Sequence, residues 1–132
     1  MIAPQLAGNV LGSVKDSFSV AEWCAEGGPP GPPRTIAPLH LHRNDDEAWY
    51  VLEGTLCVQR GDEIVEVPAG AGAMVPRGTP HTYWNPGQTQ ARYLLFMTPT
   101  ILGLIDAIHQ IEERNSATMR AVFEKFDSVL LG

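Results

Sequence analysis

Cysteine, clustered positive charge and long apolar runs are all scarce in this sequence of 132 residues. The two cysteines are Cys24 and Cys57, and the N-terminus has neither the positive region nor the long apolar segment of a secretory signal. Two cysteines in that setting are more often free thiols than a disulfide, so we expect free thiols and a cytoplasmic protein. No apolar run reaches the roughly 18 residues that a membrane span needs, so we expect no membrane partner.

Positive charge is not only scarce but scattered. Nine lysines and arginines stand against fifteen aspartates and glutamates, which gives a net charge of -6 and a pI near 5.0. The arginines are spread from Arg34 to Arg120 without a cluster, so nucleic acid is not an expected partner. The length fits one domain, residues 1–132, that can bury a core of its own.

Two histidines and a glutamate form the first chemically informative pattern. His40 and His42 are separated by one residue, so in a strand both imidazoles point to the same face. Glu47 follows after an Asn-Asp-Asp turn, which could fold its carboxylate back toward the two rings. Imidazole together with carboxylate suits a borderline divalent metal ion.

A second block about forty residues later supplies another imidazole. In the stretch from Gly70 to Asn85, Pro76 and Gly78 shape a turn immediately before His81. A strand that begins at His81 would carry its ring toward the first block.

Together the two blocks resemble the cupins, whose motifs read G-x5-H-x-H-x3-4-E-x6-G and G-x5-P-x-G-x2-H-x3-N. The matching positions are His40, His42, Glu47 and Gly54 in the first motif and Gly70, Pro76, Gly78, His81 and Asn85 in the second. One position departs, because Arg34 stands where the first motif begins with glycine. The resemblance implies an all-β cupin barrel, the double-stranded β-helix or jelly roll, in which His40, His42, Glu47 and His81 bind one divalent transition metal.

The hydrophobic pattern agrees with such a barrel over residues of about 8–97. Short alternating segments separated by Gly- and Pro-containing turns predict strands at 17–24, 35–42, 48–52, 55–60, 63–67, 73–75, 81–85 and 91–97. Residues 1–16 are interpreted as a short edge strand or an arm. Gly27 to Pro33 contains three glycines and four prolines, which predicts a loop at the barrel mouth.

After Met97 the period becomes helical, and we expect a helical segment over 98–132. Thr98-Pro99 is a helix-start signal, and isoleucines and a leucine then recur at helical spacing. Ser116 is expected to cap a second helix. Residues 129–131 fit either the end of that helix or a final strand. His109 lies off the apolar stripe and is interpreted as a surface residue.

Three further residues are expected to form a substrate pocket. If Glu47 points inward, Trp49 does too, and Tyr83 shares a face with His81. Met97 lies on the apolar face of the last strand. The alternative for Trp49 is ordinary core packing, which is the commoner fate of a buried tryptophan.

The resemblance to quercetin dioxygenase-like small cupins implies a dioxygenase-like oxidoreductase that acts on a small phenolic or other organic molecule. Four ligands leave a position open on the metal, which is typical of catalytic rather than structural sites. Iron, manganese, nickel, cobalt and zinc all suit these ligands. Glu47 would be either a ligand alone or a ligand that also acts as a catalytic base. A metal-dependent isomerase and a binding protein without turnover are the alternatives.

We also expect a homodimer. Small cupins commonly pair, and the sequence predicts an exposed apolar face with Leu41, Tyr50 and Leu52.

Overall fold

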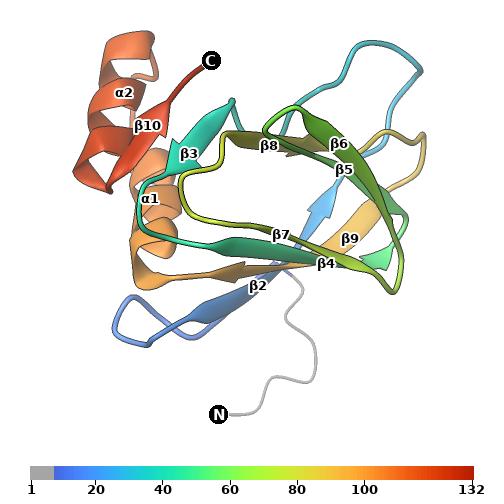
Figure 1. The fold of residues 1–132 in the computed structure, drawn as a ribbon, viewed down its shortest axis with the longest axis horizontal. Coiled ribbons are helices and arrows are strands. Elements are labelled where there is room, and N and C mark those ends of the chain that lie inside the picture. The colour runs from blue at the N-terminus through green and yellow to red at the C-terminus, as the bar shows by residue number, and fades with distance from the viewer. Residues whose placement is uncertain (1–7) are drawn as a thin grey trace.

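The computed structural model describes residues 8–132, which fold into two facing antiparallel sheets of five strands each (Figure 1). The first sheet has the order β1 (Val10–Leu11), β2 (Ser19–Ala25), β9 (Ala91–Met97), β4 (Glu47–Glu53) and β7 (Gly72–Val75). The second has the order β10 (Ser128–Leu130), β3 (His40–His42), β8 (His81–Trp84), β5 (Thr55–Arg60) and β6 (Glu63–Pro68). The predicted all-β class with C-terminal helices is confirmed.

The hydrophobic core lies between the two sheets and follows from alternation along the strands. On β4, Trp49 and Val51 are buried beside Glu47 while Tyr50 is exposed. On β9, Tyr93 and Leu95 are buried in the same layer. Because successive side chains point to opposite faces, one inward residue fixes the direction of its neighbours.

Gly54, between β4 and β5, occupies a position that only glycine fits easily. Its φ is +76°, and a Cβ atom there would lie 2.9 Å from the carbonyl oxygen of Gln90. Both the left-handed backbone and the close approach disfavour a side chain.

Two helices close one end of the barrel, at the left of Figure 1. Helix α1 (Pro99–Gln110) begins as expected, with the Thr98 side chain accepting a hydrogen bond from the Ile101 amide. Helix α2 (Ser116–Lys125) is capped by Asn115 rather than by the expected Ser116. The Asn115 side chain accepts from the Thr118 amide and the Thr118 hydroxyl accepts from the Asn115 amide, so the cap is reciprocal. No helix among residues 8–132 is long and apolar enough to cross a membrane.

Residues 129–131 are expected to form either the end of the second helix or a final strand, and the structure shows a strand. The segment 98–132 is therefore not wholly helical. Asp127, with φ of 55°, turns the chain after α2 into β10. Leu130 then pairs with His40 and Ser128 with His42 on β3. Strand β3 is also shorter than expected: it covers His40–His42 only.

The two cysteines are free, as expected: Cys24 is exposed and Cys57 is buried.

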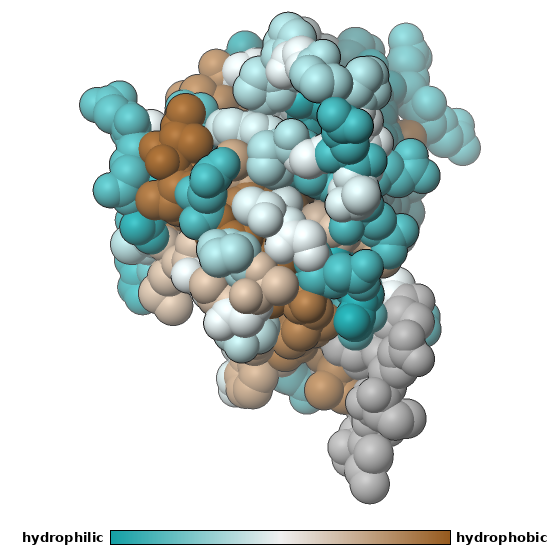
Figure 2. Space-filling view, turned by 90° about the vertical axis from the view of Figure 1, so that its right-hand side faces the viewer, coloured by the Kyte–Doolittle hydropathy of each residue, from teal (hydrophilic) through white to brown (hydrophobic). Residues whose placement is uncertain are grey.

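The predicted apolar face differs from the one that exists. Leu41 lies on β3 in the second sheet, whereas Tyr50 and Leu52 lie on β4 in the first, so these residues do not share a face. The outer face of the first sheet instead exposes Phe18 (65 %), Met74 (55 %), Tyr50 and Phe96. At the end away from the helices, Figure 2 shows apolar side chains only in separate patches with polar side chains between them.

The homodimer stays a prediction, with this outer sheet face as the contact surface because exposed apolar groups favour association. Light scattering at micromolar concentration should give twice the chain mass of 14.4 kDa. Met74→Glu should shift the mass toward the monomer, and Ile64→Glu, an equally exposed position in the second sheet, should not. A wild-type mass of one chain would contradict the prediction.

Candidate metal centre

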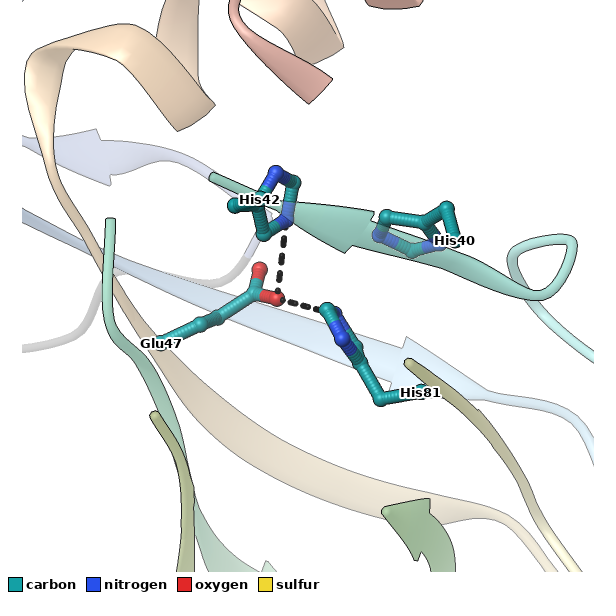
Figure 3. Close-up of side chains that lie close together, drawn as sticks. All are labelled: His40, His42, Glu47 and His81. Carbon is teal, nitrogen blue, oxygen red and sulfur yellow. Dashed lines mark hydrogen bonds and ion pairs between the residues drawn. The ribbon is translucent and has the colours of Figure 1, made fainter. Parts of the chain in front are cut away.

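Three imidazoles and one carboxylate meet between the two sheets. His40 and His42 come from β3 and His81 from the adjacent β8, directly opposite His40. Glu47 opens β4 in the facing sheet. One potential ligand atom from each residue lies within 4.8 Å of the other three, and all four residues are buried. Figure 3 shows Glu47 reaching from its sheet toward the rings of His42 and His81.

The outer nitrogen of each ring is held by a protein oxygen. His40 Nδ1 lies 2.6 Å from the Pro38 carbonyl oxygen, and His81 Nδ1 lies 2.9 Å from that of Thr79. A carbonyl can only accept, so both Nδ1 atoms carry a hydrogen. His42 Nδ1 lies 2.7 Å from the Ser128 hydroxyl oxygen.

Ser128 fixes the third ring in the same way. Its hydroxyl donates to the Phe126 carbonyl oxygen over 3.0 Å, so it accepts the hydrogen of His42 Nδ1. In its neutral form each of the three rings therefore presents an Nε2 lone pair inward, which is the arrangement that second-shell partners give to metal-binding histidines.

The Glu47 carboxylate and the histidine Nε2 atoms that face it need a positive charge between them. Glu47 Oε1 lies 3.0 Å from His81 Nε2 and 3.4 Å from His42 Nε2, and His42 Nε2 is one of the buried side-chain atoms without a hydrogen-bond partner among residues 8–132. A carboxylate oxygen and a neutral Nε2 are both acceptors. Either a proton or a metal ion must lie between them, and this donor set fits a divalent transition metal.

The charge state of the cluster also suits a cation. Burial first, and then the neighbouring His81, lower the pKa of His40 to about 4, so its ring is neutral at neutral pH. Burial alone would raise the pKa of Glu47, but the contacts with His42 and His81 outweigh it and lower the pKa to about 2. Glu47 is therefore ionised and His40 is free to act as a ligand.

Two turns hold the ligand strands in place. The Gly78 amide donates to the His42 carbonyl oxygen over 2.6 Å. The carboxylate of Asp46, next to Glu47, accepts from the backbone amide and guanidinium of Arg77 at 2.8 and 3.0 Å. These contacts tie the acidic turn before β4 to the Pro-Gly turn before β8.

A cavity of about 460 Å³ opens onto the cluster. His40, His42 and Glu47 line it together with Tyr83, which the sequence places in the pocket. The largest apolar part of its wall comes from the two helices, namely Ile101, Leu104, Ile105, Ile108, Met119 and Phe123. A volume of this size accommodates a small organic molecule.

The expectation for Trp49 and Met97 is corrected. Both are buried but neither lines this cavity. Trp49 packs behind it, with its ring centroid 5.1 Å from that of Tyr83, and Met97 contributes to a separate shallow depression. Alternation correctly turns them inward, but it does not set how deeply each side chain lies relative to the cavity.

A pair of phenols adds two hydroxyl groups to the cavity wall. The hydroxyls of Tyr83 and Tyr93 lie 3.1 Å apart. Burial raises the pKa of Tyr93 to about 12, and burial followed by the neighbouring Tyr93 raises that of Tyr83 well above its usual value. Both phenols are protonated at neutral pH. One donates to the other, which leaves one O–H available to a bound molecule.

Sequence reasoning missed Ser128, Tyr93, His109 and Arg114, all of which contact the ligands or line the cavity. Tyr93 carried a signal, because it shares the apolar face of its strand with Leu95. Ser128 carried none, since its contact with His42 joins residues 86 positions apart.

Known proteins support the family directly. A cupin domain family model matches residues 32–97. Mannose-1-phosphate guanylyltransferase RfbM of Salmonella typhimurium is 34% identical over 80 residues, which are 61% of this chain and 16% of that protein. The chain thus spans about one sixth of the length of the curated relatives that it matches.

Solved structures agree with this assignment. TT1209 from Thermus thermophilus is 26% identical, with a TM-score of 0.53 over 62% of this chain and 72% of that one. A sugar phosphate isomerase of the cupin superfamily from Silicibacter pomeroyi is 25% identical, with a TM-score of 0.54 over 63% of this chain and 51% of that one. With the family model covering half of the sequence and a His3Glu cluster between two antiparallel sheets, this chain belongs to the cupin domain family.

Proposed function

We propose that the protein is a metal-dependent cupin enzyme, a dioxygenase-like oxidoreductase that acts on a small, largely apolar organic molecule such as a phenol. One observation carries the proposal: three of the four potential ligands, His40, His42 and Glu47, line a cavity whose other walls are mainly apolar. A structural metal site has no need of such an opening.

His40, His42, Glu47 and His81 would hold the ion, which is one of iron, manganese, nickel, cobalt or zinc. A bound ion supplies Lewis-acid chemistry, and iron, manganese, nickel or cobalt can in addition support dioxygen chemistry. The protein itself contributes orientation and exclusion of water. The apolar helix walls hold the body of the molecule, and the free O–H of the Tyr83–Tyr93 pair can donate to an oxygen on it.

An isomerase is the second candidate, favoured by the likeness to a sugar phosphate isomerase. The cavity itself suits a sugar phosphate less well. Among residues 8–132, Arg114 is the one arginine in its lining and no lysine lines it, whereas a phosphate dianion generally requires several cationic or N–H partners. A binding protein without turnover is the third possibility.

Oxygen uptake with a panel of phenols separates these functions. We expect uptake that depends on the phenol and on a loaded metal, with each of iron, manganese, nickel, cobalt and zinc tested in turn. His81→Gln removes one potential ligand and should abolish uptake, while Glu66→Gln, at an exposed position outside the cavity, leaves the cluster and the cavity wall intact and serves as the control. Conversion of sugar phosphates without oxygen uptake would replace the dioxygenase with the isomerase. Saturable binding with no turnover would leave a binding protein.

The same assay resolves the two roles of Glu47. Its pKa of about 2 makes it a weak base by itself, but a metal ion acidifies a hydroxyl bound to it and so brings donor and acceptor closer. Glu47→Gln keeps an oxygen that can act as a ligand but cannot take up the proton. A variant that retains metal and full turnover would limit Glu47 to holding the ion.

Ser128→Ala should weaken metal binding about 10- to 100-fold, the usual cost of losing a second-shell partner of a ligating histidine. Without the hydroxyl, His42 loses the acceptor that fixes its tautomer. Ser19→Ala is a matched control, because Ser19 is equally buried in the other sheet and its hydroxyl has no hydrogen-bond partner among residues 8–132. Calorimetric titration with Zn²⁺ measures the metal affinity of both variants. Equal affinities for the two variants would show that Ser128 does not position the ring.

The metal-free protein should lose stability as pH falls from about 6.5 toward 4. The pKa of His40 is about 4 in the folded state and near 6.5 when unfolded, so between these values the unfolded chain binds the proton first. Glu47 adds a loss only below pH 4.5, its usual pKa. Urea unfolding at pH 7.5, 6 and 5 should show a slope of up to about 1.4 kcal/mol per pH unit for this group.

His40→Gln isolates the His40 contribution, since the other histidines remain. Between pH 7.5 and 5, the free energy of unfolding should fall more steeply on acidification in the wild type than in this variant. A stability that stays constant or rises on acidification in the wild type, with no difference from the variant, would contradict the assignment.

A further inference from the structure

The cavity extends well beyond the metal centre and ends at a basic rim. Arg114, in the connection between α1 and α2, lines it together with His109 from the last turn of α1. Both side chains are exposed. The rest of the helical wall is apolar, so the cavity has one polar end at the metal cluster and a second at this rim.

The two polar ends lie at opposite ends of α2. Phe123, near the C-terminal end of the helix, packs against His40 with ring centroids 5.4 Å apart. Arg114 precedes the N-terminal cap, nine residues earlier in the sequence. At 1.5 Å per helical residue the separation along the axis is about 13 Å. The apolar side chains of α1 that line the cavity extend from Ile101 near the start of the helix to Ile108 near its end.

Arg114 is an uncompensated charge within the described chain. Arg43, Arg60, Arg77 and Arg92 each form an ion pair with a carboxylate, whereas Arg114 forms none with any of residues 8–132. Its neighbours Glu112 and Glu113 are exposed and do not line the cavity. An arginine at a cavity rim with its fork free offers a bidentate site to a carboxylate.

The charge balance favours a carboxylate over a phosphate. No second arginine and no lysine line the cavity. One formal positive charge matches a monoanion.

We propose that the cavity binds an elongated organic acid, with its carboxylate on Arg114 at the rim, its apolar body along the helix wall and its other end at the metal cluster. The contact of the ligand's other end with the metal cluster rests on the proposed function, while recognition of the carboxylate by Arg114 does not. Both helices lie beyond residue 97, where the match to the cupin family model ends. Substrate selection is thus assigned to a part of the chain that the family match does not cover.

The test uses two probes of closely similar shape, the anionic 6-phenylhexanoate and the neutral 6-phenylhexanamide. Each is titrated into the 132-residue chain, once loaded with Zn²⁺ and once stripped by chelator, and binding is followed by protein NMR. The carboxylate should bind about 5-fold or more tightly than the amide in both forms, as expected for a charge-assisted contact that is partly screened by solvent.

Arg114→Gln should reduce that preference to less than about twofold while leaving the amide affinity unchanged, since the apolar wall is intact. Arg114→Lys keeps the charge and should retain part of the preference. Lys15→Gln removes one positive charge at an exposed position outside the cavity and should leave the preference unaltered.

Several results would overturn the proposal. A preference that survives in Arg114→Gln would place the carboxylate elsewhere. A preference that disappears when Zn²⁺ is removed would place it on the metal. Failure of both probes to bind, or displacement of the acid by lower concentrations of glucose 6-phosphate, would reject the elongated acid as the ligand class. None of these readouts depends on oxygen uptake, so the proposed dioxygenase activity can fail while the carboxylate site stands.

Discussion

A buried carboxylate facing imidazole lone pairs is the constraint on which the rest of this structure depends. Glu47 is buried, and its polar neighbours within the sheets are His42 and His81 rather than a lysine or arginine. An isolated buried charge costs several kcal/mol, so it persists only with a compensating cation. A divalent metal ion compensates the carboxylate and uses the lone pairs of all three rings at once, whereas a proton satisfies only one contact at a time.

The fold is arranged so that the two sheets each contribute to this cluster. The second sheet carries the three histidines of the cluster, and the first carries Glu47 together with much of the aromatic packing behind it. The C-terminal segment has two separate structural roles. Strand β10 brings Ser128 to His42, and the preceding helices form the apolar wall of the cavity. The residues that would hold the ion and the residues that would select its substrate therefore lie on different parts of the chain.

The sequence predicts well which residues form the buried cluster, because the relevant information is local. His40 and His42 share a face by strand alternation, and the turn chemistry around Pro76 and Gly78 positions His81. Alternation gives the direction of a side chain but not its depth, which explains why Trp49 and Met97 point inward without reaching the cavity. Ser128 and Arg114 depend on how the C-terminal segment packs on the barrel, and no spacing rule connects them to the ligands.

The central claim is that His40, His42, Glu47 and His81 together bind one divalent ion, and a stoichiometric metal titration tests it most directly. Protein stripped with chelator is titrated with Zn²⁺ and with Mn²⁺ by calorimetry, in the wild type and in the His42→Gln variant. We predict one ion per chain in the wild type and an affinity lowered by at least about 100-fold in the variant, beyond the second-shell range because a ligand itself is lost. Absence of binding in the wild type, or unchanged binding in the variant, would contradict the account.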